Sequence, residues 1–306
     1  MSRTPQAEDP KISPARLMAL TALTMLAFAG NSLLCRMALE HTGLDPATFT
    51  TIRVVSGALT LWMLVQLRRA HRTGSRGNWT SALALFVYAA GFSFAYVSLT
   101  AASGALMLFV AVQATMVGHG LWRGERFRHL QIAGLVLALG GLVGLLLPGL
   151  SAPPLGGSIL MLAAGAAWGV YSLRGKGSGD PLAATAGNFL RAVPVALVLS
   201  VLAHRQFNFD SSGFWYAVSS GAIASGVGYA IWYTVLPFLK ATEAATVQLS
   251  VPVIAAVGGI ILLDEPMTLR LVIASVAILG GIALVIRKPG APSAAKRVPA
   301  GNSPRR

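Results

Sequence analysis

The chain has 306 residues, of which 55% are hydrophobic and 11% are charged, and its mean hydropathy is +0.66. Soluble domains carry about 25% charged residues, so this composition excludes a soluble enzyme of this length. It also excludes a disordered chain, because disorder requires low hydrophobicity. Cys35 is the only cysteine, which excludes a secreted scaffold held by disulfides.

Apolar runs of about twenty residues recur along the chain, and each is long enough to cross a ~30 Å hydrocarbon core as a helix. Short connections with Gly, Pro or charged residues separate them. We therefore expect an all-α integral membrane protein with ten transmembrane helices. In chain order the predicted spans are 15–38, 46–67, 79–99, 103–122, 128–148, 155–174, 182–203, 212–236, 242–263 and 267–287.

The positions of Lys and Arg predict the orientation of these spans. If the N-terminus is cytoplasmic, nineteen of the 24 basic residues fall in cytoplasmic segments, three in outer loops and two within spans. Cytoplasmic loops carry such an excess, so we expect both termini in the cytoplasm. Residues 1–14 then form a cytoplasmic segment, and residues 288–306 a basic disordered tail that touches anionic lipid. This placement explains the net charge of +14 without a nucleic-acid partner.

The two halves of the chain resemble each other in sequence. Residues 104–143 align with residues 244–283 at a constant offset of 140, which places Glu125 over Glu265. Further matches upstream are Tyr96 with Tyr233, Asp45-Pro46 with Asp180-Pro181, and Arg53 with Arg191 within a few residues.

Residues 15–148 and 155–287 are therefore expected to be two copies of one five-helix unit. An odd number of spans forces the second copy into the membrane from the opposite side, so the repeat is inverted. Inverted repeats are typical of carriers, in which the substrate site lies near the midplane at the repeat interface.

Each unit ends with a glutamate turn that precedes a glycine pair. The pairs are Gly124-Glu125 with Gly140-Gly141, and Asp264-Glu265 with Gly280-Gly281, while Trp168-Gly169 lies near the start of the second unit. Over almost the whole chain these features resemble the EamA-type branch of the drug/metabolite transporter superfamily. The resemblance implies a ten-helix basket around a central cavity in a bacterial inner membrane.

Within that superfamily the chain most resembles the YddG-type amino-acid exporters, through Trp168, Tyr171 and an aromatic-rich eighth span. It departs from the family pattern at Gly30-Asn31, where Trp-Gly is common, and at Val112, where a proline is common. The second copy keeps that proline as Pro252. The resemblance implies export, which the repeat by itself does not.

We accordingly expect a monomeric secondary transporter that exports neutral or aromatic amino acids and related small metabolites by alternating access. Its partners are the small-molecule substrate and membrane lipid. A drug or quaternary-cation exporter stays open, because aromatic faces also hold cations. A lipid scramblase or channel is the alternative from another class, although it predicts a continuous polar path. Nucleotide-binding and metal-binding motifs are missing from the sequence, so we expect no enzymatic activity, cofactor or metal.

Aromatic side chains with polar atoms gather inside three predicted spans. Within the third and sixth spans they lie three or four residues apart and so share a helix face. Tyr hydroxyls and Trp N–H groups need partners away from water, which favours a wet or ligand-filled space, whereas lipid contact or helix packing is the alternative. The candidate substrate-binding aromatics are Tyr88, Phe92, Trp168, Tyr171, Tyr229 and Trp232.

Two amides complete the candidate substrate site. Asn31 and Gln248 lie within spans, and Gln248 precedes Pro252 by one turn. The missing N–H of that proline frees a carbonyl in the previous turn, so the pair could bind an ammonium group. Hydrogen bonding between helices is the alternative role for both amides. Pro252, Gly226 and Gly228 are the candidate hinges, with tight packing as the alternative for the glycines.

Arg53 and Arg191 are the two basic residues deep inside spans, away from the span ends, roughly 10–13 Å from the start of each helix at 1.5 Å per residue. Their similar placement favours a shared structural role, and the alternative is that one of them clamps a substrate carboxylate. All ten acidic residues lie near helix ends or in loops. Proton-driven carriers commonly hold a carboxylate at depth, so the sequence favours a facilitator or exchanger.

Overall fold

The structure, a computed structural model, describes residues 12–68, 77–124, 129–149, 152–175, 180–239, 244 and 247–286. Within these ranges all regular secondary structure is helical. The α-helices are α1 (Pro14–His41), α2 (Pro46–Leu67), α3 (Trp79–Tyr96), α4 (Ala101–Trp122), α5 (His129–Leu146), α6 (Leu155–Gly175), α7 (Pro181–Leu202), α8 (Ser211–Ser219), α9 (Gly228–Val235), α11 (Ser250–Leu263) and α12 (Leu269–Ile286). Two short 3-10 helices are η1 (His204–Gln206) and η3 (Leu236–Phe238), and a π-helix is η2 (Ser220–Val227).

The helices fall where the apolar runs predict them. Eight are long and apolar enough to cross a membrane, namely α1 to α7 and the continuous run Ser211–Phe238. The described parts of the last two, Ser250–Leu263 and Leu269–Val285, are shorter apolar helices. The expectation of a multi-pass, all-helical membrane protein is thereby confirmed, whereas ten full spans go beyond this observation. The predicted terminal segments 1–14 and 288–306 lie almost wholly outside the described residues.

α2 and α7 begin in the same way, because their sequences carry the same start signal. Asp45 accepts hydrogen bonds from the N–H groups of Ala47 and Thr48, at 3.0 and 2.9 Å. Asp180 accepts the equivalent pair, from Leu182 and Ala183. An aspartate N-cap followed by proline satisfies the free N–H groups of the first turn and presets its backbone. Both helices then run for 22 residues.

The predicted eighth span is not a uniform helix. It widens into a π-helix over η2 and tightens again at η3. A side chain at Gly221 would collide with the carbonyl of Arg53 and the hydroxyl of Ser56, so glycine allows η2 to pack directly on α2. At Gly226 a Cβ atom would meet the Thr60 side chain at 2.8 Å. The candidate hinge glycines thus lie at a close helix contact.

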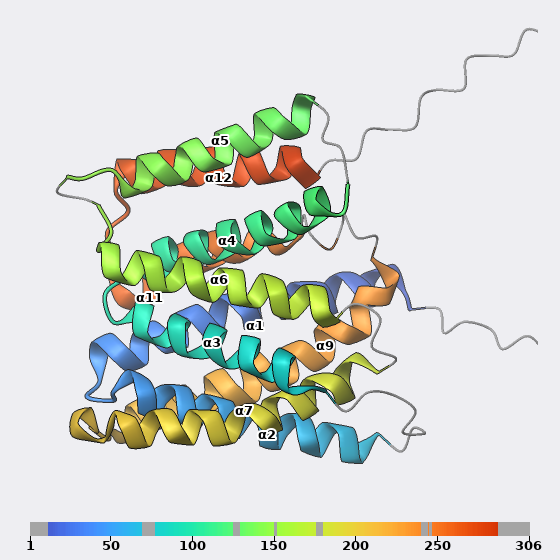
Figure 1. The fold of residues 1–306 in the computed structure, drawn as a ribbon, viewed down its shortest axis with the longest axis vertical. Coiled ribbons are helices and arrows are strands. Elements are labelled where there is room, and N and C mark those ends of the chain that lie inside the picture. Colours follow the sequence, from blue (N-terminus) through green and yellow to red (C-terminus); the bar gives the residue numbers. More distant parts are fainter. Residues whose placement is uncertain are drawn as a thin grey trace, which may run out of the picture.

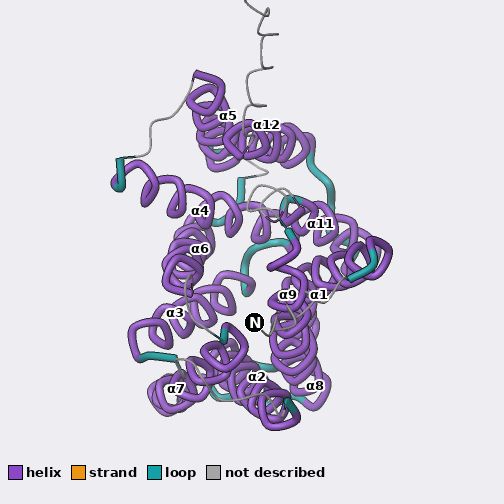
Figure 2. The backbone as a smooth tube through the Cα atoms, turned by 90° about the vertical axis from the view of Figure 1, so that its right-hand side faces the viewer, coloured by secondary structure: helices purple, strands orange, loops and turns teal. Residues whose placement is uncertain are grey.

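The helices run side by side across the bundle, with α5 and α12 packed together at one edge and α2 and α7 at the other (Figure 1). Seen along their length, α1, α9 and α8 lie on one side and α3 and α6 on the opposite side (Figure 2). Exchanging the two units maps several of the larger helix contacts on other contacts: α3 with α6 becomes α9 with α1, and α4 with α6 becomes α11 with α1. α1 begins and α12 ends at the same end of the bundle (Figure 1).

Candidate functional site

A cavity of about 40 Å³ lies in the middle of the bundle, between the two units. The first unit contributes residues from α1, α3 and α4, and the second contributes residues from α6, η2, α9 and the turn before α11. Its volume is room for a few water molecules. Six of the eight predicted binding residues line it: Asn31, Tyr88, Phe92, Trp168, Tyr229 and Gln248.

Trp168 stands at the centre of the aromatic wall. Its ring stacks on Tyr171 on one side and on Tyr229 on the other, with ring centroids 5.3 and 5.4 Å apart and both interplanar angles 27°. Tyr88 of the first unit approaches the same indole to 4.8 Å. Tyr171 therefore packs on a ring that lines the cavity without lining it itself. Trp232 makes an edge contact with Phe28, which lines the cavity. These two are the predicted binding residues that the structure places outside the lining.

A hydrogen-bond network beside these rings joins four helical segments, α1, α2, α3 and η2. Asn31 on α1 donates to the hydroxyl of Tyr88 at 3.3 Å and accepts from Ser220 of η2 at 2.7 Å. Arg53 on α2 donates from Nη2 to the same hydroxyl at 2.8 Å. Asn31 thus connects the two units through buried groups, as its predicted alternative role requires, while it also faces the cavity.

Arg53 is the most deeply buried charged side chain of the described residues, at 2% exposure. Its guanidinium carbon lies 5.1 Å from the ring centre of Tyr88 and 4.8 Å from that of Phe92. Nη1 is fully buried and has no hydrogen-bond partner within the described residues. Among the described residues, the titratable groups that face it are Tyr88, Tyr229 and Cys35, and none of them is a carboxylate. Arg53 therefore borders the cavity as a charge without a carboxylate.

Arg191 lies in a different environment from Arg53. It is only half-buried, and its Nη1 donates to the carbonyl of Gly187 on its own helix at 2.9 Å. Counted from the aspartate caps, the residue that corresponds to Arg53 is Asn188, three positions earlier. The shared role expected for the two arginines from their spacing is thus not matched by equivalent positions.

Gln248 reaches the cavity from the turn before α11, and its side-chain N–H donates to the carbonyl of Ala244 at 3.1 Å. Pro252 is buried one turn further along. The amide oxygen of Gln248 is the group that remains for a ligand donor, since no hydrogen bond to it is formed within the described residues. This arrangement keeps Gln248 as a candidate contact for a donor group of a substrate.

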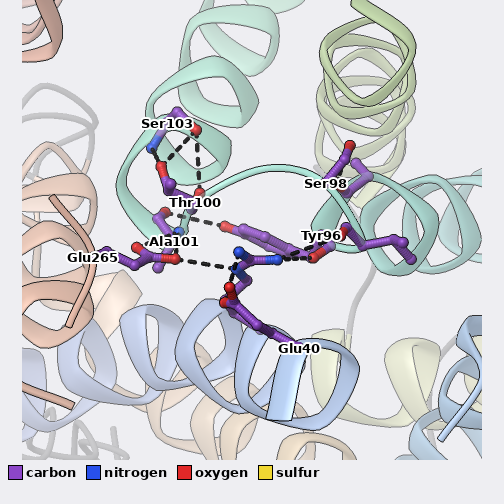
Figure 3. A network of polar contacts seen from close by, with 10 residues as sticks. Glu40, Tyr96, Ser98, Thr100, Ala101, Ser103 and Glu265 are labelled. Carbon is purple, nitrogen blue, oxygen red and sulfur yellow. Dashed lines mark hydrogen bonds and ion pairs between the residues drawn. The ribbon is translucent and has the colours of Figure 1, made fainter. Parts of the chain in front are cut away.

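One end of the bundle is closed by an ionic network that the sequence reading did not identify (Figure 3). Arg36, at the end of α1, pairs with Glu40 at 2.6 Å and with Glu265 at 3.1 Å. It also donates to the carbonyl of Tyr96 at 3.0 Å. Glu265 in turn accepts the N–H of Ala101, at the start of α4, at 2.8 Å. The network ties α1 to the α3–α4 and α11–α12 connections.

Burial raises the pKa of Glu265 above its usual value, although Arg36 and the N–H of Ala101 act in the opposite direction. The repeat alignment had singled out Glu265 only as a partner of Glu125, which lies outside the described residues. In the sequence Glu265 otherwise stood out only as part of the Asp264-Glu265 turn. In the structure Asp264 has a φ of 50°, which turns the chain sharply after α11. Arg36, counted as an outer-loop charge, gave no signal in the sequence.

The opposite end holds an apolar groove of about 580 Å³ between α1 and α11. Its α1 residues run from Leu17 to Leu26, and those of the central cavity follow from Phe28 to Ser32. Val247 lines the groove and the adjacent Gln248 lines the cavity. The groove thus lies next to the cavity in sequence along α1 and at Val247-Gln248, at the end where α1 begins.

Comparison with known proteins gives one family. The model of the EamA-like transporter family matches residues 16–147 and again residues 155–287. An uncharacterized protein of Pseudomonas aeruginosa is 58% identical over 271 residues, which cover 89% of this chain and 94% of that protein. An uncharacterized transporter of Archaeoglobus fulgidus is 26% identical, covering 88% of this chain and 96% of its own length.

Another uncharacterized transporter, YvbV of Bacillus subtilis, is 25% identical and covers 93% of this chain and 96% of its own length. A solved crystal structure matches with a TM-score of 0.63 at 18% identity, over 89% of this chain and 98% of that chain. At this identity the likeness concerns the fold alone. Among the described residues no group of His, Cys, Asp or Glu side chains is arranged to hold a metal ion.

Proposed function

Because this chain belongs to the EamA-like transporter family, we propose that it is a secondary carrier for neutral and aromatic amino acids and related small metabolites in a bacterial inner membrane. The observation that supports this most is the central cavity, to which both units contribute aromatic rings and hydrogen-bonding side chains. A membrane transporter of this family implies a small-molecule substrate and contact with lipid.

The proposed architecture is ten spans in two inverted units, 15–148 and 155–287. The exchange of helix contacts between the units supports it, and so does the return of α12 to the end where α1 begins. Five spans in each unit require that the second unit runs through the membrane in the opposite sense. Since the cavity is lined from one chain, we propose that the monomer is the working unit.

Alternating access is supported by the difference between the two ends of the bundle. The Arg36–Glu265 network closes one end, while the groove beside Leu17 lies next to the cavity at the other. The excess of basic residues assigns the groove to the cytoplasmic side. Loading from the cytoplasm followed by opening of the network gives export, as in the YddG-type exporters that the sequence resembles. Because the cavity measures only about 40 Å³, it has to widen for an amino acid to enter.

Stacked rings at the cavity support the choice of substrate. Trp168 and Tyr229 present flat faces that suit an aromatic or apolar side chain, and Asn31 and Gln248 offer polar atoms for an amino-acid backbone. A drug or cation exporter would use the same rings, but the positive charge of Arg53 beside them opposes a cation. Among the described residues, the hydrogen-bonding side chains at the cavity form one cluster and no continuous polar path, which disfavours a scramblase or channel.

The test is uptake of radiolabelled amino acids into proteoliposomes that contain the full chain. We expect saturable uptake of a few neutral or aromatic amino acids, lost in Trp168→Ala. The matched control is Trp62→Ala, since Trp62 is 47% exposed on α2 and does not line the cavity. Absence of uptake for every amino acid by folded protein would contradict the proposal, and uptake that does not saturate would favour a channel.

A further inference from the structure

We propose that the carrier recognises an acidic group of its substrate, which binds at the Tyr88 hydroxyl in the field of Arg53. The inference rests on the proposed function and names the substrate class more closely. Substrates are organic anions or zwitterions with a carboxylate, and amines without an acidic group are poor substrates. Three separate features of the site support this.

The first feature is the uncompensated charge. A charged side chain inside a membrane is costly, so it normally pairs with an opposite charge or serves a transport pathway. Within the part of the chain that the structure describes, Arg53 has no carboxylate beside it, since the titratable groups that face it are two tyrosines and one cysteine. The acids of the described residues lie instead at helix ends, where Asp45 and Asp180 cap helices and Glu265 pairs with Arg36. A substrate anion would supply the missing charge.

The second feature is the set of unused donors. Nη1 of Arg53 has no partner within the described residues. The hydroxyl of Tyr88 already accepts from Arg53 and from Asn31, so its own hydrogen is left to donate. Asn31 uses one N–H for Tyr88, and its second N–H remains. The site therefore offers donors and lacks a charged acceptor, which is the complement of a carboxylate.

The third feature is the occupied ring face. Aromatic rings in a cavity are commonly the seat of a cationic ligand. Here the guanidinium of Arg53 lies over the rings of Tyr88 and Phe92, at 5.1 and 4.8 Å from their centres. The protein's own cation thus takes that position, and a second cation would meet like charge. Tyr88 itself lines the cavity, whereas Arg53 stands directly behind it.

The experiment compares four ligands of one shape with the purified full chain: phenylalanine, 3-phenylpropionate, phenylalaninamide and phenethylamine. Thermal stabilisation measures binding, and competition with radiolabelled phenylalanine uptake measures transport. We expect the two carboxylates to bind and compete, and the amide and amine to be at least about tenfold weaker, as for a lost hydrogen bond to a charged group. Equal binding of all four, or preference for the amine, would overturn the inference.

Three variants locate the site. Tyr88→Phe removes the phenolic hydrogen and keeps the ring, and we expect about a tenfold loss of affinity for phenylalanine. Its matched control is Tyr216→Phe on α8, away from the cavity. Arg53→Gln should lose the preference for phenylalanine over phenylalaninamide, and Arg53→Lys should keep it. If Arg53 had a merely structural role, Arg53→Gln would lower the affinity for both ligands equally. Retention of the preference for phenylalanine in Arg53→Lys would contradict such a role.

The outcomes separate the two proposals. Saturable transport of phenethylamine with no effect of phenylalanine leaves a carrier and overturns the anion site. Failure of all four ligands with folded protein contradicts the amino-acid carrier itself. If Arg53→Gln does not fold, the ligand series with wild type, Tyr88→Phe and Arg53→Lys still decides.

Discussion

The eighth residue after the aspartate cap is buried in both α2 and α7, but the two helices use this position differently. In α2 it is Arg53 and in α7 it is Asn188, and each donates to a tyrosine hydroxyl on a neighbouring helix. Asn188 uses both the nitrogen and the oxygen of its amide, because its oxygen also accepts the N–H of Asn78 at 2.9 Å. Arg53 keeps a buried donor without a partner.

The surroundings of the two positions are otherwise closely alike. Thr50 and Thr185 occupy the same place in the two helices and return their hydroxyls to the first proline carbonyl, at 2.7 and 2.8 Å. In the second unit this position thus joins neighbouring helices by hydrogen bonds, and in the first unit it carries a charge beside the cavity. The difference teaches that the repeat supplies the scaffold, whereas the function comes from where the copies diverge.

Replacing Arg53 in α2 by asparagine, the residue at the equivalent position of α7, should have the largest effect on uptake. Arg53→Asn removes the charge behind Tyr88, and we expect phenylalanine uptake at low concentration to fall on the order of a hundredfold. Initial rates in proteoliposomes measure it, with protein that elutes as a folded species from size-exclusion chromatography. Uptake within a few-fold of wild type would mean that the two positions are functionally equivalent.

Removing the hydrogen bonds of Asn188 in α7 should lower the stability of the protein and leave its selectivity between substrates unchanged. Asn188→Ala leaves the N–H of Asn78 without a partner and removes one of the two hydrogen bonds of the Tyr171 hydroxyl, at a position that is 5% exposed. The expected loss is about 1–3 kcal/mol in the free energy of unfolding, measured by denaturant titration. A change in the ratio of phenylalanine to phenylalaninamide uptake would show that this position also recognises substrate.

The closed end should respond to pH through Glu265. Its pKa is raised by burial in the folded protein, so the folded state binds a proton more readily than the unfolded state. The stabilisation is complete below the unfolded value of about 4.3 and is lost as pH rises through the raised folded value. Thermal unfolding of wild type should show this loss, and Glu265→Gln should not. A parallel pH dependence of both proteins would assign it to another group.

The smallest effect is expected at Arg191. It is half-buried, does not line the cavity, and returns a donor to its own helix. Arg191→Gln should therefore change uptake by no more than about twofold, as for substitutions outside the core. Kinetics beside Arg53→Asn check this, and a comparable loss in both variants would restore the shared role that their spacing suggested.

Much of the fold could be predicted from the sequence, since a membrane span is a local property of twenty or so apolar residues. The caps at Asp45 and Asp180 are equally local, and they mark where two helices begin. The sequence also identified six residues that the structure brings to one cavity, because aromatic and amide side chains inside apolar spans stand out by type. It matched Arg53 with Arg191 only within a few residues, and the offset of three became visible once the aspartate caps were aligned, since charge alone does not fix an alignment.

Only the tertiary structure decided which polar atoms are satisfied. Asn31 and Asn188 look alike in sequence, and both join helices, yet only Asn31 also lines the cavity. Arg36 and Glu265 lie 229 positions apart and meet only because the two units pack against each other. Hydrophobic length depends on neighbours along the chain, so the sequence determined the membrane fold. Hydrogen bonds and charges depend on neighbours across helices, so the spare donor of Arg53 became visible only in the packed molecule.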